Sequence, residues 1–322
     1  MTMWQTLPKP FTILAPMEEV TDTVFRQIVM RAGKPDVFFT EFCNVDGLQS
    51  KGREKVIHRL QYTKGEHPIV AQIWGNTPEH YYTTAKELVE MGFDGIDINM
   101  GCPEKDVIKS GSCIALINNR TLAAEIIDAT RRGAGNLPVS VKTRIGLNTI
   151  ATEDWCGWLL SQHLDALTVH GRTAKEQSDF PAHWDEIGKV VKLRDQMKLK
   201  TMIIGNGDVR DKQDAQEKAQ TYGVDGVMIG RGIFENLWCF SDHQPTQEER
   251  LYMLIEHARL WEKTWGRTKH FAIMRKFVKA YVKGWDCASE LRAKLMTANS
   301  TSEMEEMIST LSTTFKMFRR IY

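Results

Sequence analysis

The sequence predicts a (β/α)8 TIM barrel followed by a small all-α C-terminal helical domain. Eight short segments rich in Val and Ile recur over residues 1–240. Amphipathic stretches separate them, such as TPEHYYTTAKELVEMG at 77–92, which has a helix start signal and a glycine stop. Strand signals end after residue 240. Eight βα units of this combined length are typical of a TIM barrel.

The predicted strands are short and most of them end in glycine or a polar residue. They span 12–17, 36–42, 68–75, 95–101, 138–146, 166–172, 201–207 and 226–232. A doubly wound open sheet is the alternative architecture. It is disfavoured because no GxGxxG follows the first strand.

The remainder of the chain has helical periodicity. Residues 241–250 are polar and contain proline, which indicates a linker. Helical spacing then recurs over 247–265, 270–284, 287–298 and 302–319, which predicts four helices. We therefore expect a catalytic barrel domain at 1–240 and a helical domain at 241–322.

Composition narrows the class of protein. Hydrophobic residues make up 42% of the 322 residues, and the six cysteines contain no CxxC pair. A zinc or iron–sulfur site and a disulfide framework are therefore not expected. The basic segment followed by an apolar stretch that is typical of a signal peptide is not seen, so no signal peptide is expected. No apolar run approaches the roughly 20 residues of a membrane span. We expect a soluble, reduced, cytoplasmic monomer without metal.

The net charge of +1 hides an asymmetry along the chain. Residues 241–322 carry 14 Lys/Arg against 10 Asp/Glu, a net of +4, and residues 1–240 carry 28 against 31, a net of −3. Within 259–294 there are ten basic and three acidic residues. Such a basic block indicates a polyanionic partner.

Polar residues gather at the ends of the predicted strands, where barrels place their chemistry. Some have ordinary structural interpretations: Gln72 as a hydrogen-bonded core residue, His170 as a structural histidine. Lys142 is harder to explain in this way, because a lysine inside an apolar strand is costly to bury without a partner.

The loops after the last two strands indicate a phosphate site. IGNGD and IGRG are small enough to expose backbone N–H groups, which bind phosphate together with an arginine. Gln72 could address one edge of a ring system, and Lys142 could place positive charge beside a ring that becomes anionic on reduction. This combination favours flavin mononucleotide (FMN) over a nicotinamide cofactor as the bound group.

The motifs LAPMEEVTD, AQIWG, NMGCP, VKTRIG, VHGR, NGD and IGRG, in this order, resemble those of the tRNA-dihydrouridine synthases over about 10–240. Residues 274–295 (MRKFVKAYVKGWDCASELRAKL) are similar to the tRNA-binding helical domain of that family. The resemblance implies a flavin enzyme that reduces a D-loop uridine of tRNA to 5,6-dihydrouridine. NADPH or NADH would reduce the flavin, and no motif separates the two.

The resemblance also implies roles for individual residues. Cys102 would be the general acid that gives a proton to carbon 5 of uracil, after hydride reaches carbon 6. With the ordinary cysteine pKa of about 8.5, it would be mostly thiol at neutral pH. Asn99, Arg144 and Arg172 would contact the substrate. The flavin-binding positions are Pro16, Met17, Glu18, Gln72, Lys142, His170, Asn206, Gly207, Asp208, Gly230 and Arg231.

Two departures from the family pattern lie at the mouth of the predicted site. The family commonly has PMEGVTD, whereas Glu19 here replaces the glycine. The loop after GCP is bulkier than usual, with Lys109, Cys113 and Ile114 where small residues are common. Cys113 is also a rival to Cys102 as a reactive thiol, and the other four cysteines are expected to be structural.

A uridine inside folded tRNA must be extruded to reach a barrel site, at a cost of a few kcal/mol that backbone contacts offset. Arg275, Lys276, Lys279 and Lys283 are the expected contacts, because 275, 279 and 283 recur at i+4 on one helix face. The interleaved aromatic residues Trp261, Trp265, Tyr281 and Trp285 are expected in the core rather than as stacking platforms.

Two other functions remain open from the sequence alone. One is a different flavin barrel, similar to dihydroorotate dehydrogenases, acting on a free pyrimidine; the basic helical domain argues against it. The other is an RNA-binding protein that assists tRNA folding and holds flavin only as a structural group.

Overall fold

The structure is a computed structural model, and it describes residues 2–311. The chain divides into two compact units, each made of two segments. The first consists of Met1–Thr23 and Pro35–Arg231, and the second of Val24–Lys34 and Gly232–Tyr322. The assignment of a catalytic domain to 1–240 and an RNA-binding domain to 241–322 stays a prediction.

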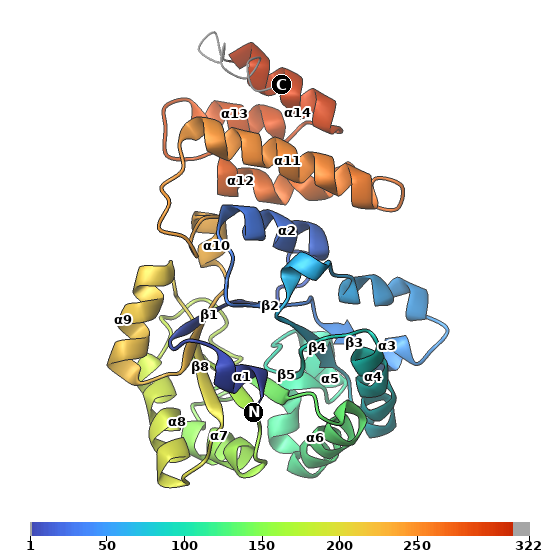
Figure 1. Cartoon of the computed structure of the whole chain (residues 1–322), viewed down its shortest axis with the longest axis vertical. Helices are drawn as coiled ribbons and strands as arrows, with labels where there is room; N and C mark the ends of the chain where they lie inside the picture. Colours follow the sequence, from blue (N-terminus) through green and yellow to red (C-terminus); the bar gives the residue numbers. More distant parts are fainter. Residues whose placement is uncertain (1, 312–322) are drawn as a thin grey trace. The chain divides into compact units, whose positions relative to one another are not determined.

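The first unit is a closed barrel of eight parallel strands, which confirms the predicted fold class (Figure 1). Neighbouring strands pair in the order β2-β1-β9-β8-β7-β6-β5-β4, and pairing of β2 with β4 closes the barrel. Each predicted strand segment overlaps one of these strands, and seven of the eight contain it completely; β1 begins one residue before its predicted segment. A two-residue strand, β3 (Cys43–Asn44), lies beside β4 and was not predicted. The barrel strands are β1 (Phe11–Leu14), β2 (Val37–Phe39), β4 (Ile69–Trp74), β5 (Gly95–Met100), β6 (Val139–Arg144), β7 (Ala166–His170), β8 (Met202–Asn206) and β9 (Gly226–Ile229).

Helices α4 to α9 surround the strands of the barrel (Figure 1). Local signals define their ends: Asp211 caps α9 by accepting a hydrogen bond from Asp214 N, and Gly223 ends it in the left-handed conformation. The helices of this unit are α1 (Met3–Thr6), α3 (Val45–Leu48), α4 (Pro78–Glu90), α5 (Lys105–Lys109), α6 (Arg120–Ala134), α7 (Thr152–Ser161), α8 (Trp184–Gln196) and α9 (Lys212–Tyr222). Four 3-10 turns join them: η1 (Arg53–Lys55), η2 (Ile57–Leu60), η3 (Lys64–Glu66) and η4 (Cys113–Asn118).

The N-terminal end of the barrel is filled by apolar side chains. Trp4 of α1 is fully buried against Phe11 and Phe39, with ring centroids 5.9 and 6.3 Å apart. Val70, Ala166, Met202, Ile204 and Met228 belong to the same cluster. The inside of this half of the barrel is therefore a packed hydrophobic floor.

The second unit is helical. Phe25 of α2 stacks against Phe234 and Phe277, with ring centroids 6.4 and 5.1 Å away. Trp261, Trp265 and Tyr281 are buried, as expected of core residues, whereas Trp285, which was expected with them, is only partly buried. The unit contains α2 (Thr23–Ala32), α10 (Gly232–Glu235), α11 (Gln247–Trp265), η5 (Phe271–Phe277), α12 (Val278–Tyr281), α13 (Ala288–Leu295) and α14 (Thr301–Leu311). The part of the predicted helix 302–319 beyond residue 311 lies outside the described residues.

The prediction of one continuous helix over 270–284 is wrong. The segment forms the 3-10 helix η5, followed by a single α-helical turn that ends at Tyr281. Val282 leaves the helical conformation with ψ 85°, and Gly284 turns the chain with φ +85°. Arg275, Lys279 and Lys283 therefore do not lie on one face of a regular helix.

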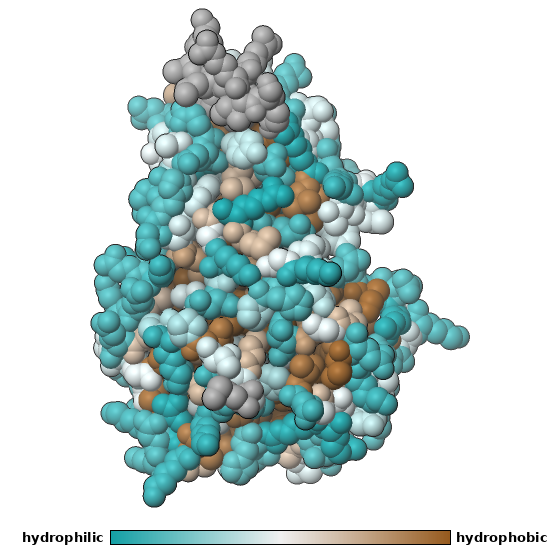
Figure 2. All heavy atoms as spheres, viewed as in Figure 1, coloured by the Kyte–Doolittle hydropathy of each residue, from teal (hydrophilic) through white to brown (hydrophobic). Residues whose placement is uncertain are grey.

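Within residues 2–311, no helix has the length and hydropathy of a membrane span. On the visible face of each unit, hydrophilic side chains surround small, separate hydrophobic patches (Figure 2).

Candidate functional site

The C-terminal ends of the barrel strands bring the polar residues of the first unit together. Strand register places Asn99 beside Lys142, Arg144 beside His170, and His170 beside Asn206 on neighbouring strands. The catalytic, cofactor and substrate residues predicted from this unit all lie near strand ends or in the loops that follow directly. Parallel strands in a closed barrel put all these ends on one face.

A buried amide network joins β4 and β5. Gln72 is fully buried; its Nε2 donates to Asp97 Oδ2 at 2.7 Å, and its Oε1 accepts from Asn99 Nδ2 at 3.1 Å. Ser140 Oγ donates to Asp97 Oδ1 at 2.6 Å. Burial raises the pKa of Asp97 to about 6, although the hydrogen bonds from Ser140 and Gln72 act against this shift.

Asp97 was not predicted as a site residue, although the sequence held a signal for it. In GIDINMG, Asp97 and Asn99 alternate on one face of a strand that is otherwise apolar. A buried carboxylate on the same face as a predicted site residue is a candidate for the same site.

Asn99 and Arg144 hold the turn that carries Cys102. Asn99 Oδ1 accepts hydrogen bonds from the backbone N–H groups of Gly101 and Cys102, both at 3.0 Å. Arg144 Nε donates to the carbonyl of Gly101 at 2.8 Å, and its Nη1 donates to the carbonyl of Thr173 at 3.1 Å. Both side chains were predicted to contact substrate, but in the structure these polar atoms hold the backbone of the loop.

The Cys102 thiol is partly exposed. The nearby Cys113 thiol lowers the pKa of Cys102 to about 7, against burial, which raises it. With this lower pKa, more of the Cys102 thiol is ionised near neutral pH than the ordinary cysteine pKa of about 8.5 implies. Burial raises the pKa of Cys113 well above the ordinary value, so this residue remains a thiol.

The Lys142 side chain lies near Asp97, Arg144 and Cys102. Burial, then the nearby Arg144, lower the pKa of Lys142 to about 8, while Asp97 and Cys102 favour its charged form. Within residues 2–311, its Nζ makes no hydrogen bond or ion pair. A partly buried ammonium in this state is an available donor for a ligand.

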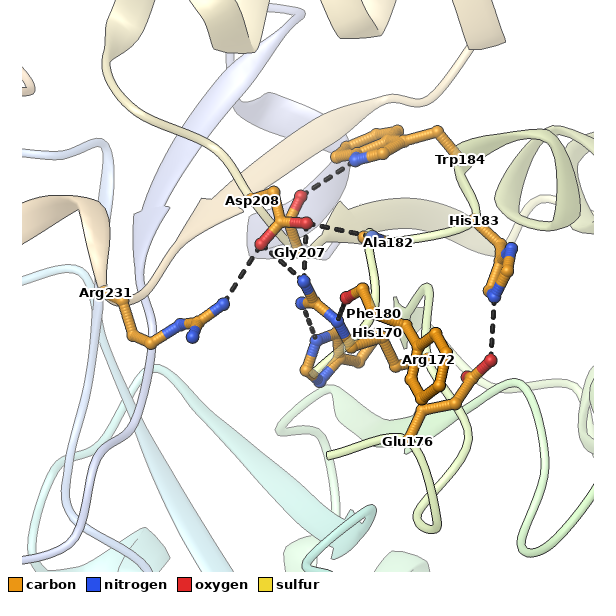
Figure 3. A network of polar contacts seen from close by, with 10 residues as sticks. All are labelled: His170, Arg172, Glu176, Phe180, Ala182, His183, Trp184, Gly207, Asp208 and Arg231. Atoms are coloured by element: carbon orange, nitrogen blue, oxygen red, sulfur yellow. Dashed lines mark hydrogen bonds and ion pairs between the residues drawn. The ribbon is translucent and has the colours of Figure 1, made fainter. Parts of the chain in front are cut away.

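The opposite side of the site is a network of charged groups after β7, β8 and β9 (Figure 3). Nη2 of Arg172 lies 2.6 and 2.5 Å from the two carboxylate oxygens of Asp208. Nη2 of Arg231 lies 3.0 Å from Asp208 Oδ1, and Ala182 N donates to Oδ2 at 2.9 Å. Burial raises the pKa of Asp208, but the hydrogen bonds from Arg172 and Ala182 outweigh it and hold this pKa below its usual value.

His170 is neutral in this network. Burial, with the positive charges of Arg144, Lys142 and Arg172, lowers the pKa of His170 well below its usual value. Nη1 of Arg172 lies 3.3 Å from its Nε2. Because a guanidinium can only donate, Nε2 is the acceptor and the proton sits on Nδ1.

Gly207 is required by the backbone. Its φ is +126°, and a Cβ there would lie 2.7 Å from the Cβ of Ala182. Trp184 Nε1 donates to the Gly207 carbonyl at 2.8 Å. The turn after β8 therefore keeps its exposed backbone in one conformation.

The backbone is left-handed at Glu19 and Cys113, two positions where glycine or a small residue was expected from the sequence. Glu19 has φ +57° and Cys113 has φ +54°. The conformation explains why glycine suits both positions, since a side chain there costs roughly 1–2 kcal/mol. Glu19 N donates to Glu41 Oε1 at 2.6 Å, which holds the loop after β1 in place.

The loop after β1 contains Pro16, Met17 and Glu18, all partly buried. Met17 N donates to Thr21 Oγ1 at 2.9 Å. Glu18 Oε1 accepts from Nε and Nη2 of Arg59 at 2.8 and 2.5 Å. Sequence reasoning missed Arg59, which lies in η2, about forty residues away, with no local signal for this contact.

In the second unit, the predicted RNA contacts have different environments. Arg275 donates to the carbonyl of Ala298 at 3.2 Å and to Asn299 Oδ1 at 3.0 Å. Lys283 forms an ion pair with Glu235 at 2.8 Å. Lys276 and Lys279 are exposed. Arg275 and Lys283 therefore stabilise the helical unit itself, and Lys279 is better placed to meet a partner.

Within residues 2–311, His, Cys, Asp and Glu form no group of three that could hold a metal ion.

Comparison with known proteins gives consistent matches over nearly the whole chain. Residues 13–317 match the family model described as dihydrouridine synthase (Dus). A probable tRNA-dihydrouridine synthase of Staphylococcus epidermidis is 45% identical over 314 residues, which cover 95% of each chain. The probable tRNA-dihydrouridine synthase 2 of Bacillus subtilis is 42% identical over 312 residues, again 95% of each.

Among solved structures, a morphinone reductase is similar with a TM-score of 0.50 and 17% identity. The match covers 73% of this chain and 86% of that chain. At this identity the likeness shows the shared barrel fold alone.

Proposed function

The chain belongs to the dihydrouridine synthase family, and from this premise we propose that it reduces a D-loop uridine of tRNA to 5,6-dihydrouridine, with FMN as cofactor and NADPH or NADH as reductant. The observation that carries the proposal is that two groups lie together at the C-terminal end of the barrel strands. They are Lys142, whose Nζ has no hydrogen bond or ion pair within residues 2–311, and the Cys102 thiol, whose pKa is lowered. We place the enzyme in the cytoplasm as a monomer, where tRNA is accessible.

The residues at the strand ends fit a flavin. The Nζ of Lys142 has no hydrogen bond or ion pair within residues 2–311. The Nε2 of His170 faces Arg172, so its Nδ1–H is left as the donor. The amide of Gln72 is held rigidly by Asp97 and Asn99, with one N–H and one lone pair left for a ring edge. When bound, FMN would supply the hydride that reaches carbon 6 of uracil.

The loops after β8 and β9 fit the phosphate end of such a cofactor. Gly230 leaves backbone open, because a Cβ there would meet only Ala15, at 3.6 Å, whereas Gly207 is buried and its carbonyl accepts from Trp184. Arg172 holds Asp208 by two short contacts, whereas Arg231 is exposed and touches one carboxylate oxygen. Arg231 can therefore turn towards a phosphate while Asp208 keeps its main partner. Asn206 Nδ2 donates to the Met228 carbonyl at 2.8 Å and joins the two loops.

Cys102 is the proposed general acid. Its Sγ–H proton goes to carbon 5 of uracil, and the thiolate that remains is stabilised by the Cys113 thiol and by the charge of Arg144. The contacts that lower the pKa of Cys102 therefore favour the product of proton transfer. Asn99 and Arg144 fix the backbone of the turn that carries the Cys102 thiol.

We assign catalysis to the barrel (1–240) and tRNA binding to 241–322. The basic side chains of the helical unit would contact RNA phosphates: Lys276 and Lys279 are exposed, and Arg275 and Lys283, which also have partners within the unit, are partly buried. Lys279→Glu should weaken tRNA binding and reduce its salt slope by about 1. Lys200→Glu, an equally exposed change in the barrel unit, is the control. Equal binding by both variants over a salt series would contradict the assignment.

The decisive experiment uses tRNA isolated from a strain that lacks this gene. The purified protein, NADPH or NADH, and that tRNA should yield dihydrouridine at a D-loop position, mapped by primer extension or mass spectrometry. Heat-released chromophore should have the mass of FMN. Absence of dihydrouridine with both reductants, from protein that contains the flavin, would overturn the proposal.

A further inference from the structure

The two most exposed large hydrophobic side chains of residues 2–311 lie on adjoining loops at the C-terminal ends of the barrel strands. Phe180, in the loop after β7, is 56% exposed, and Ile150, in the loop after β6, is 47% exposed. A backbone hydrogen bond from Ala174 N to the Gly146 carbonyl, at 3.0 Å, joins the two loops. Apolar surface left in water beside a polar site is a feature of surfaces that bind a partner.

We propose that these two loops, residues 145–151 and 171–183, form a rim that binds unpaired nucleobases of the tRNA beside the target uridine, with Phe180 as the stacking platform. We call them the β6–β7 rim. The inference deepens the proposed function and rests on it, because it takes the substrate to be folded RNA. Unpaired bases of RNA loops are commonly bound by stacking on exposed aromatic side chains.

The β6–β7 rim is continuous with the turn that carries Cys102. Nε of Arg144 donates to the carbonyl of Gly101 at 2.8 Å, and Nη1 donates to the carbonyl of Thr173 at 3.1 Å. One buried guanidinium thus joins the residue before Cys102 to the loop that carries Phe180. The rim therefore borders the place where a target base would meet the Cys102 thiol.

The backbone at Phe180 is fixed while its ring is exposed. The Phe180 carbonyl accepts a hydrogen bond from Nε of the buried Arg172 at 2.5 Å (Figure 3). Ala182 N, two residues further along, donates to Asp208 Oδ2 at 2.9 Å. Because this segment is already ordered, stacking of a base on the ring costs little additional conformational entropy.

The charge of the β6–β7 rim suits bases better than phosphates. Residues 145–151 contain no charged side chain and expose Asn148 and Thr149 beside Ile150. In residues 171–183 two basic and two acidic side chains cancel: Arg172, Lys175, Glu176 and Asp179. Phosphate contacts release counterions and make binding depend on salt, whereas stacking on an uncharged ring does not. The rim should therefore contribute affinity without contributing to the salt slope.

The test measures tRNA binding by the full-length protein over a salt series. Phe180→Ala should weaken binding by about fivefold to 150-fold, the range for loss of one stacked base, with an unchanged salt slope. Phe180→Trp should keep the affinity, because it retains a flat aromatic face. Phe180→Leu should lose affinity like Phe180→Ala, which separates stacking from general apolar contact.

Two further variants serve as controls. Met197→Ala removes a 40% exposed hydrophobic side chain between α8 and β8, at the other end of the barrel, and should leave tRNA binding unchanged. Ile150→Ala should weaken binding by a smaller factor than Phe180→Ala, since an aliphatic side chain offers no stacking face. In steady-state assays Phe180→Ala should raise KM for tRNA and keep kcat, because its side chain does not act on the reacting atoms.

Equal tRNA affinity in Phe180→Ala and the unmodified chain would overturn the proposal, as would full affinity in Phe180→Leu or a reduced salt slope in Phe180→Ala. Equal affinity with an altered oligomeric state, measured by light scattering, would assign the rim to a second copy of this chain instead. If Phe180→Ala binds tRNA weakly at an unchanged slope but the unmodified chain forms no dihydrouridine, the rim stands and the proposed function fails. Dihydrouridine formation with the same KM in both proteins keeps the function and removes the rim.

Discussion

The polar groups on the two sides of the barrel mouth are held by different interactions, buried hydrogen bonds on one side and ion pairs on the other. On the β4–β6 side, Gln72, Asp97 and Asn99 are buried and joined by short hydrogen bonds in an apolar surrounding. On the β7–β9 side, Asp208 and Arg231 are partly exposed and joined as ions around the buried Arg172. The first side fixes geometry and shifts pKa values, whereas the second can exchange an ion partner for a ligand.

This difference fits a division of labour in the proposed reaction. Proton transfer needs a donor of tuned pKa in a fixed place, which the buried side provides through Cys102 and its loop. Phosphate binding needs positive charge that remains accessible, which Arg231 provides.

The largest effect is expected for Cys102→Ala. Loss of the general acid should slow dihydrouridine formation by about 10²–10⁴-fold while FMN stays bound, because the thiol acts on uracil and not on the cofactor's phosphate. Single-turnover reduction of tRNA by the pre-reduced enzyme measures it. Cys156→Ala, at a buried cysteine of α7, is the control and should keep the rate. A rate unchanged in Cys102→Ala would remove this residue from the chemistry.

Gln72→Ala should lower the free energy of unfolding by about 1–3 kcal/mol for each buried group that loses its partner, here Asp97 Oδ2 and Asn99 Nδ2. Arg231→Ala, on the exposed side, should change it by less than about 1 kcal/mol. Denaturant unfolding of the two flavin-free variants compares them. Equal losses would mean that the two sides are not held differently.

The rate of the protonation step should fall as pH rises above about 7, where Cys102 loses its proton. The sign follows from the role: an acid is active in its protonated form, so the rate is highest below its pKa and drops about tenfold per pH unit above it. In Cys113→Ala the nearby thiol that lowers the pKa of Cys102 is gone, and the fall should move to higher pH. A profile that rises through this range would assign Cys102 to a base.

The smallest effect is expected for Arg231→Lys, which keeps the charge but loses the planar donor pair. FMN should bind about threefold to tenfold more weakly, or about 0.7–1.4 kcal/mol, with little change in the rate of proton transfer. Fluorescence titration of the flavin-free protein gives the dissociation constant. A variant that binds FMN normally but reacts slowly would place Arg231 on the reacting side instead.

Much of the architecture was predictable from local pattern. Apolar segments of alternating or continuous character, ended by glycine or polar residues, predicted all eight barrel strands. Because a barrel of parallel strands has all its C-terminal ends on one face, the polar residues at these ends could be expected to meet. The helix at 247–265 was also predictable, with Thr246 and Glu249 forming its capping box.

Local sequence pattern did not predict the backbone conformation of two segments. The helix expected through 284 stops at Tyr281, because the chain turns at Val282 and Gly284. The left-handed backbone at Glu19 is stabilised in part by Glu41, which is distant in sequence. No propensity of either segment indicates these outcomes.

Periodicity and residue type were therefore enough to predict the barrel, the helical character of the rest of the chain and the set of polar strand ends. The pairing of groups became visible only in the folded chain, where Gln72 meets Asp97, Arg172 meets Asp208, and Cys113 lowers the pKa of Cys102. The physical reason is that pKa and hydrogen bonding depend on burial and on charges a few ångströms away in space, and both are properties of the folded chain.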